Sequence, residues 1–149
     1  ADKKRVGHLE RQRNGPDYED FTEYEITYLN PEEKKGFRDK PVYIITNSAV
    51  FSAGEIFVLS LKGIPNVTVV GNNTKGMLSS MLERHLFNGW DYTLSNQRIY
   101  TRDTICYEKY GVPPDVTFLQ TKEHIKLRTD SIILKTLNLN KIPLSKLNN

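Results

Sequence analysis

The most regular hydrophobic pattern of the chain runs from residue 41 to residue 71. The apolar run Val42-Tyr43-Ile44-Ile45 predicts a strand that is buried on both faces. Apolar residues at helical spacing follow from Ile56 to Leu61, and Gly63-Ile64-Pro65 ends that pattern. A second apolar run from Val67 to Val70 predicts another buried strand. Strand, helix and strand at this spacing form a βαβ unit, in which the two strands are parallel.

The first forty residues are more polar and predict a hairpin followed by a loop. Apolar and polar residues alternate around Val6 to Glu10, and apolar residues recur from Asp20 to Leu29. Between them, Asn14-Gly15-Pro16-Asp17 is typical of a turn. Residues 30–40 carry a proline, a glycine and several charges, which favours a loop.

The later part of the chain predicts more strands and a last helix. Met81 to Phe87 and Trp90 to Leu94 flank Asn88-Gly89, a strong hairpin signal. Arg98 to Tyr100 predict a short third strand. An apolar stripe over residues 129–139 predicts the C-terminal helix, with an acidic residue in its first turn.

The length of 149 residues suits one domain with a real hydrophobic core. We therefore predict a single α/β domain over residues 1–149. It comprises a polar hairpin and loop (1–40), a core (41–139) and a tail (140–149). The core combines the βαβ unit with an added β-rich segment and the C-terminal helix.

Composition excludes several classes of function. The net charge is only +3 and basic residues are mixed with acidic ones, so we expect no nucleic-acid partner. No apolar run approaches the length of a membrane span. Cys106 is the single cysteine and no Cys/His cluster has zinc spacing, so we expect no internal disulfide, metal or other cofactor. The chain starts at Ala1 without a signal peptide, which leaves targeting open.

The segment Ser52-Ala53-Gly54-Glu55 has two interpretations. As S-x-x-E before an apolar run, it is typical of a helix capping box. Alternatively, Ser52 is a nucleophile whose attack on a carbonyl generates an oxyanion that the N–H of Ala53 stabilises at the helix start. Small residues such as Gly54 would let a substrate approach. Glu55 itself is expected to be a cap or a pocket wall.

A polar, glycine-rich loop, Gly71 to Gly76, follows the second strand of the βαβ unit. In open α/β sheets, ligands bind at the carboxyl ends of such strands. The loop lacks the spacing of a phosphate-binding motif, which argues against a nucleotide site. We expect Gly54, Thr74 and Gly76 to contact a substrate.

Taken in order, the motifs of the chain resemble the C-terminal half of the tail-specific, or C-terminal-processing, serine peptidases. That family includes the tricorn protease core and the repeats of the interphotoreceptor retinoid-binding protein. The resemblance covers roughly residues 41–138. The motifs that carry it are Ser52-Ala53-Gly54-Glu55, Val70-Gly71, Thr74-Lys75-Gly76 and Glu108-Lys109-Tyr110-Gly111-Val112-Pro113-Pro114-Asp115.

The resemblance implies a ClpP/crotonase-like core with Ser52 as nucleophile and the N–H of Ala53 in the oxyanion hole. Ser-Lys members carry their lysine where this chain has Met77, which cannot accept a proton. Lys75, two residues earlier, would need a strongly depressed pKa to act as a base. Tricorn-like members use a serine, a histidine and a glutamate, and Glu108 matches that glutamate.

The family histidine and the second oxyanion donor come from upstream of the nucleophile, and this chain has no match for that segment. His8, His85 and His124 do not match the family histidine. We therefore expect this chain to be the C-terminal part of a peptidase domain, inactive alone and prone to self-association. The resemblance also implies peptide or protein substrates and a location in the bacterial cell envelope or outside the cell.

Two functions remain open. The first is a serine peptidase of the tricorn-like branch. The second is a non-catalytic module on the same fold that binds a ligand or peptide, as in the retinoid-binding relatives.

Overall fold

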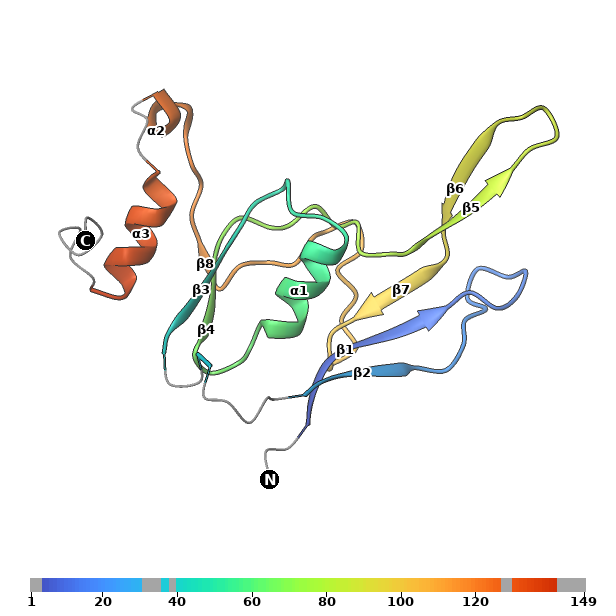
Figure 1. The fold of residues 1–149 in the computed structure, drawn as a ribbon, viewed down its shortest axis with the longest axis horizontal. Helices are drawn as coiled ribbons and strands as arrows, with labels where there is room; N and C mark the ends of the chain where they lie inside the picture. The colour runs from blue at the N-terminus through green and yellow to red at the C-terminus, as the bar shows by residue number, and fades with distance from the viewer. Residues whose placement is uncertain (1–3, 31–35, 38–39, 127–129, 142–149) are drawn as a thin grey trace.

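The computed structural model describes residues 4–30, 36–37, 40–126 and 130–141 (Figure 1). The predicted α/β class is confirmed. The elements follow one another as β1 (Arg5–Gln12), β2 (Glu25–Leu29), β3 (Val42–Thr46), α1 (Ala53–Leu61), β4 (Val67–Gly71), β5 (Met81–His85), β6 (Asp91–Ser95), β7 (Gln97–Tyr100), β8 (Val116–Thr117), α2 (Lys122–Lys126) and α3 (Ser131–Leu139).

The predicted βαβ unit forms the centre of the structure. Strands β3 and β4 pair in parallel, with Val42 opposite Val67 and Thr46 opposite Gly71, and α1 connects them. The short β8 adds a third parallel strand on the other side of β4, which gives the order β3-β4-β8. The carboxyl ends of β3 and β4 therefore lie at one edge, where the chain turns toward α1 and toward the 72–77 loop.

The prediction that β3 is buried on both faces is wrong. Strand β3 lies at the edge of the three-stranded sheet, and the side chain of Ile45 is 41% exposed. Strand β4 occupies the middle, so Val69 and Val70 are fully buried as predicted. An apolar run alone does not distinguish an edge strand from a central strand. The buried core consists of Val58, Leu59, Val69, Leu78, Ile99 and Val112.

A second sheet has the order β2-β1-β7 and is antiparallel throughout. The predicted N-terminal hairpin is confirmed, although β2 begins at Glu25, later than the pattern predicts. Phe21 makes only an isolated bridge with Arg13. Strand β7 is the predicted third strand, and it pairs with β1, whose sequence lies almost ninety residues earlier. The N-terminal segment is thus tied to the later half of the chain.

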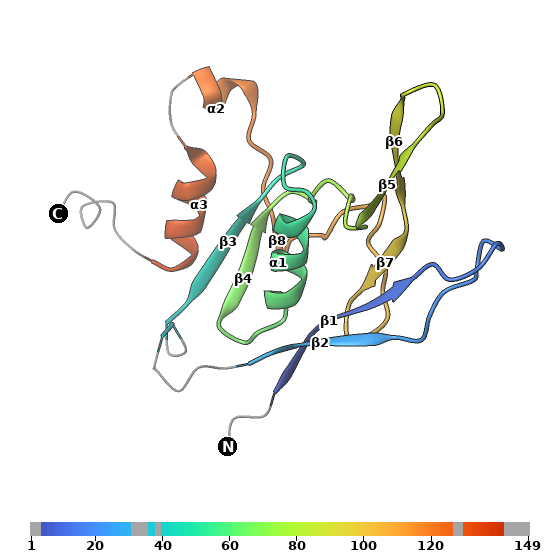
Figure 2. The same cartoon turned by 45° about the vertical axis from the view of Figure 1, so that its right-hand side comes forward.

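The second predicted hairpin, β5–β6, is also confirmed. Its register runs from Met81 opposite Ser95 to His85 opposite Asp91. Figures 1 and 2 show this hairpin projecting from the body of the molecule, on the side opposite α2 and α3. Its strands are largely exposed to solvent.

At the C-terminal end, α3 contacts β4 and begins at Ser131. Asp130 is the N-cap, because its side chain accepts a hydrogen bond from the N–H of Ile133. The prediction placed Asp130 inside the first turn and the start at Thr129, which lies outside the described residues. Helix α2 and strand β8 were not predicted. Most of the predicted 30–40 loop and nearly all of the 140–149 tail also lie outside the described residues. None of the described helices is both long and apolar enough to cross a membrane.

Candidate active site

Ser52 occupies a strained turn between β3 and α1. Its backbone has φ +53° and ψ −125°, and its side chain is exposed. A residue other than glycine in such a sparsely populated conformation costs on the order of 1–3 kcal/mol, and such strain gathers at functional sites. The backbone of Ser52 thus holds its hydroxyl out to solvent.

The capping-box prediction for Ser52 and Glu55 is wrong. Ser52 is the N-cap residue of α1, yet its side chain makes no capping hydrogen bond. Its carbonyl oxygen instead accepts from the N–H of Glu55 at 2.8 Å and of Ile56 at 3.1 Å. The helix therefore begins without using the hydroxyl of Ser52, which remains available for other chemistry.

Glu55 turns into the protein, where its side chain is fully buried. Its carboxylate accepts hydrogen bonds from Thr74 Oγ1 at 2.5 Å, from the N–H of Gly76 at 2.7 Å and from the N–H of Met77 at 2.7 Å. Three donors to one buried carboxylate satisfy the need of such a group for partners. Glu55 is thus the anchor of the 74–77 loop, and neither a helix cap nor an exposed pocket wall.

The anchored loop runs directly alongside Ser52. The N–H of Lys75 donates to the carbonyl of Val50 at 2.8 Å, and the N–H of Ser52 donates to the carbonyl of Met77 at 3.0 Å. The side chains of Lys75 and Met77 are both exposed. The βαβ unit and the loop that follows it therefore converge on Ser52.

A second segment, residues 109–112, closes against the same loop. Gly76 and Gly111 have φ of +82° and +76°. A Cβ on Gly111 would lie 2.1 Å from the carbonyl oxygen of Thr74, and a Cβ on Gly76 would lie 2.6 Å from the carbonyl carbon of Lys109. Only glycine permits this approach at both positions. The N–H of Val112 completes the contact by donating to Thr74 Oγ1 at 2.6 Å.

The residues predicted to contact substrate differ in their accessibility. Thr74 and Gly76 are buried, and the hydroxyl of Thr74 is occupied by Glu55 and Val112. Gly54 is half-buried and Ala53 is exposed. Among the described residues, the N–H of Ala53 has no acceptor, as expected of the first turn of a helix. Ala53 is therefore free to donate to a developing oxyanion, while substrate contact by the other three stays a prediction.

Glu108 is half-buried and held in place from one side only. Its Oε2 accepts from the N–H of Leu78 at 2.9 Å and of Ser79 at 3.1 Å. Its Oε1 has no donor among the described residues. The sequence singled out both Glu55 and Glu108 as candidate site residues. Only Glu108 keeps a carboxylate oxygen without a donor among the described residues.

One peptide group connects Ser52 and Glu108. The carbonyl of Met77 accepts from Ser52, and the N–H of Leu78, in the same peptide group, donates to Glu108. Two hydrogen bonds and one amide join the two residues, so the Ser52 nitrogen and Glu108 Oε2 lie no more than about 8.5 Å apart. Ser52 and Glu108 are therefore held by the same peptide group.

None of the three histidines of the chain contacts Ser52 or Glu108. His8 is buried beside Ser60, with 3.2 Å between Nδ1 and Oγ. Burial lowers the pKa of His8, and the carboxylate of Glu10 opposes that shift. His85 pairs with an aspartate on the projecting hairpin, and His124 stacks on Phe118 near α2. The described residues also contain no cluster of three or more His, Cys, Asp or Glu side chains that could hold a metal ion.

Comparison with known families assigns the chain. The model of Peptidase family S41 matches residues 2–118, most of the chain and all of the site described above. This chain belongs to peptidase family S41.

Individual relatives agree with this assignment. The nisin-resistance protein of Lactococcus lactis is 24% identical over 84 residues, which cover 56% of this chain and 26% of that protein. The structure of a candidate peptidase from Parabacteroides merdae superposes with a TM-score of 0.85 at 27% identity and covers 93% of this chain and 44% of that one. The tricorn protease superposes with a TM-score of 0.60 at 26% identity over 73% of this chain and 11% of that one. The S41 chain described here thus spans less than half the length of these relatives.

Proposed function

We propose that this S41 chain forms the C-terminal part of a serine peptidase domain in which Ser52 is the nucleophile. The proposal rests on the backbone conformation and the exposure of Ser52. Its strained backbone exposes a hydroxyl that the helix does not use, and the free N–H of Ala53 lies beside it. Glu108, with one carboxylate oxygen available, accepts from the Met77–Leu78 peptide group, whose carbonyl accepts from Ser52.

In the proposed reaction, Ser52 Oγ attacks the carbonyl carbon of a peptide bond and loses its proton to a base. The N–H of Ala53 stabilises the oxyanion of the tetrahedral intermediate. The base then protonates the leaving amine, and water hydrolyses the acyl-enzyme by the same steps in reverse. Glu108 Oε1 accepts the N–H of an imidazole, holding the ring in one orientation and stabilising its charged form.

The base in this proposal is a histidine supplied by the part of the polypeptide upstream of this chain. Support comes from the length of the relatives and from the places of the three local histidines, which are engaged elsewhere. A serine-lysine pair has less support, because Met77 stands at the position of the family lysine and the exposed Lys75 forms no hydrogen bond with Ser52 among the described residues. The second oxyanion donor is assigned to the same upstream part.

The test is replacement of Ser52 by Ala in the full-length protein. Hydrolysis of peptides should fall to background, while thermal melting changes little, because Ser52 makes no side-chain cap whose loss would cost stability. The matched control is the exposed Ser80→Ala, which should retain full turnover. Covalent labelling by a fluorophosphonate separates the alternative function, since a non-catalytic binding module would not label. Normal turnover by the Ser52→Ala protein would overturn the assignment.

A further inference from the structure

A groove of about 760 Å³ opens beside Glu108. One wall is the tip of the β1–β2 hairpin, the other is the β5–β6 hairpin, and β7 lies between them. Residues along it include Arg13, Phe21, Arg84, Asn96, Glu108 and Lys109. Because Lys109 also donates its N–H to Gly76, the groove ends at the loop that runs past Ser52. A chain bound in this groove would therefore lead into the proposed active site.

Positive charge dominates the walls of the groove. The guanidinium of Arg13 donates only to the carbonyls of Tyr18 at 2.9 Å and Pro16 at 3.1 Å, and that of Arg84 only to the carbonyl of Glu83. Arg84 and Lys109 have no carboxylate partner among the described residues, and Arg13 forms no ion pair there, although its charge helps to lower the pKa of Glu19. Arg98 is the exception, because Glu19 pairs with it at 3.0 Å. Glu108 is the one carboxylate that lines the groove.

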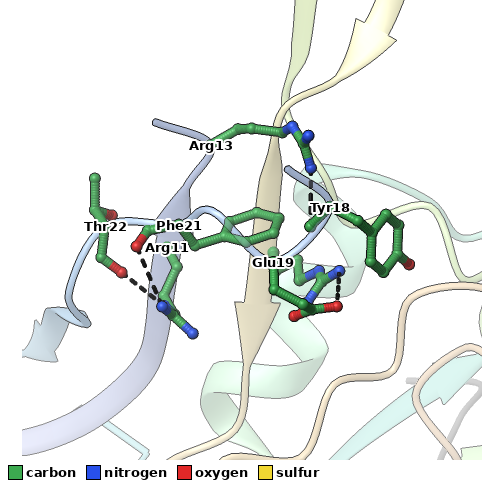
Figure 3. A network of polar contacts seen from close by, with 7 residues as sticks. Arg11, Arg13, Tyr18, Glu19, Phe21 and Thr22 are labelled. Carbon is green, nitrogen blue, oxygen red and sulfur yellow. Dashed lines mark hydrogen bonds and ion pairs between the residues drawn. The ribbon is translucent and has the colours of Figure 1, made fainter. Parts of the chain in front are cut away.

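The wall formed by the β1–β2 tip is partly aromatic and is held by several contacts. The ring of Phe21 lies under three guanidinium groups, at 5.7 Å from Arg11, 5.8 Å from Arg13 and 4.3 Å from Arg98. Figure 3 shows Phe21 together with Arg11 and Arg13, both of which are also bonded to backbone carbonyls. These contacts hold the wall in place before any ligand binds, which reduces the entropy cost of binding.

We propose that this groove binds an extended segment of the peptide substrate that carries acidic side chains. This inference rests on the proposed peptidase function. Carboxylates of the substrate pair with Arg84 and Lys109, two cations that line the groove. Since Glu108 marks only one end of the groove, the acidic preference applies to residues on one side of the cleaved bond.

The experiment uses the full-length protein and a series of fluorogenic peptides. The series places Glu, Gln or Lys at successive positions on either side of the cleaved bond. We expect kcat/KM to fall about three- to tenfold when Glu is replaced by Lys on one side only. The charge-reversed protein with Arg84→Glu and Lys109→Glu should reverse that order and prefer Lys. The control Lys122→Glu, on the exposed helix α2, should leave the order unchanged.

A binding measurement separates failure of this inference from failure of the proposed function. A labelled acidic peptide is titrated into the full-length Ser52→Ala protein, followed by fluorescence anisotropy. Tighter binding than to the matching Lys peptide, lost in the charge-reversed protein, supports the groove even if no peptide is hydrolysed. Ser52-dependent hydrolysis without any charge preference overturns the inference and leaves the peptidase intact. A large drop in melting temperature on charge reversal, with unchanged peptide preference, would mean that another part of the polypeptide fills the groove.

Discussion

At the scale of single residues, neither Ser52 nor Glu55 takes the capping role that their spacing predicts. The helix start needs neither side chain, because the carbonyl of Ser52 receives the first N–H groups of α1. The strain of the Ser52 backbone is offset by the hydrogen bond that its N–H donates to Met77 and by those that its carbonyl accepts from Glu55 and Ile56. Glu55 is left to bind the 74–77 loop from inside the protein. The result is a free hydroxyl on a rigid support.

Replacing Glu108 by Gln in the full-length protein should reduce turnover by about two to four orders of magnitude. A neutral amide cannot stabilise an imidazolium in the way a carboxylate does, although it can keep the contacts with Leu78 and Ser79. Steady-state kinetics on a fluorogenic peptide would measure the effect, with circular dichroism to verify the fold. Lys75→Ala is the matched variant and should lose less than about tenfold. The opposite ranking would identify a displaced serine-lysine pair.

Replacing Glu55 by Ala should destabilise the protein by roughly 3 kcal/mol or more. The change leaves three buried donors, on Thr74, Gly76 and Met77, without an acceptor, and each such loss costs on the order of 1–3 kcal/mol. Urea denaturation would measure it. Glu83→Ala, at an exposed position of β5, should stay within about 0.5 kcal/mol. Equal stability of the two variants would show that Glu55 does not anchor the loop.

At the scale of elements, the site is the junction of the βαβ unit with two loops. Gly76 and Gly111 allow the 74–77 loop and the 109–112 segment to interlock, and Asp115 then accepts from the N–H of Val69 at 2.8 Å. The Gly-Val-Pro-Pro-Asp segment is therefore pinned to β4 as well as to the loop. Glu108 lies directly before the 109–112 segment, so its position depends on this interlock.

Replacing Gly111 by Ala should cost clearly more stability than replacing Gly89 by Ala. Both glycines have positive φ, at +76° and +85°, so both variants incur about 1–2 kcal/mol of backbone strain. A Cβ added at Gly111 would lie 2.1 Å from the carbonyl oxygen of Thr74, whereas a Cβ added at Gly89 would meet nothing within 4 Å. The difference in unfolding free energy between the two variants therefore measures the clash. Gly111→Ala should also reduce turnover in the full-length protein. If the two variants melted alike and were equally active, the interlock would be refuted.

At the scale of the whole molecule, the described surface carries many exposed apolar side chains. Phe51, which precedes Ser52, and Phe57, on α1, are 59% and 58% exposed. Strand β3 has no strand on its outer edge among the described residues. Patches and free edges of this kind normally pack against something. Because the chain spans less than half the length of its relatives, we expect an upstream part of the polypeptide to cover them.

Prepared alone, the 149-residue chain should be folded at least in part, self-associate, and hydrolyse no peptide. An unassisted serine hydroxyl is a weak nucleophile, and no histidine of the chain contacts Ser52. Analytical ultracentrifugation would report association, and a fluorogenic peptide assay would report activity. The isolated Ser52→Ala chain is the control. Turnover that disappears in that control would mean that a base lies within these residues.

Local pattern was enough to predict the βαβ unit, both hairpins, the third strand, the last helix and the serine at the helix start. Each depends on hydrophobic period and turn residues within a few positions of one another, and such signals act locally. The ordered motifs were enough to predict the family, because their spacing reflects one shared fold. The identities of Ser52 and Glu108 as a nucleophile and its orienting acid remain predictions.

Tertiary structure alone decided which of the marked side chains are free. Glu55 meets Thr74 across 19 residues, and Glu108 meets Leu78 across 30 residues, so no local pattern distinguishes the anchored acid from the accessible one. The edge position of β3, the pairing of β7 with β1 and the groove with its unpartnered cations also arise from contacts between distant segments. Burial and hydrogen bonding are properties of the assembled chain, and they determine which groups can react.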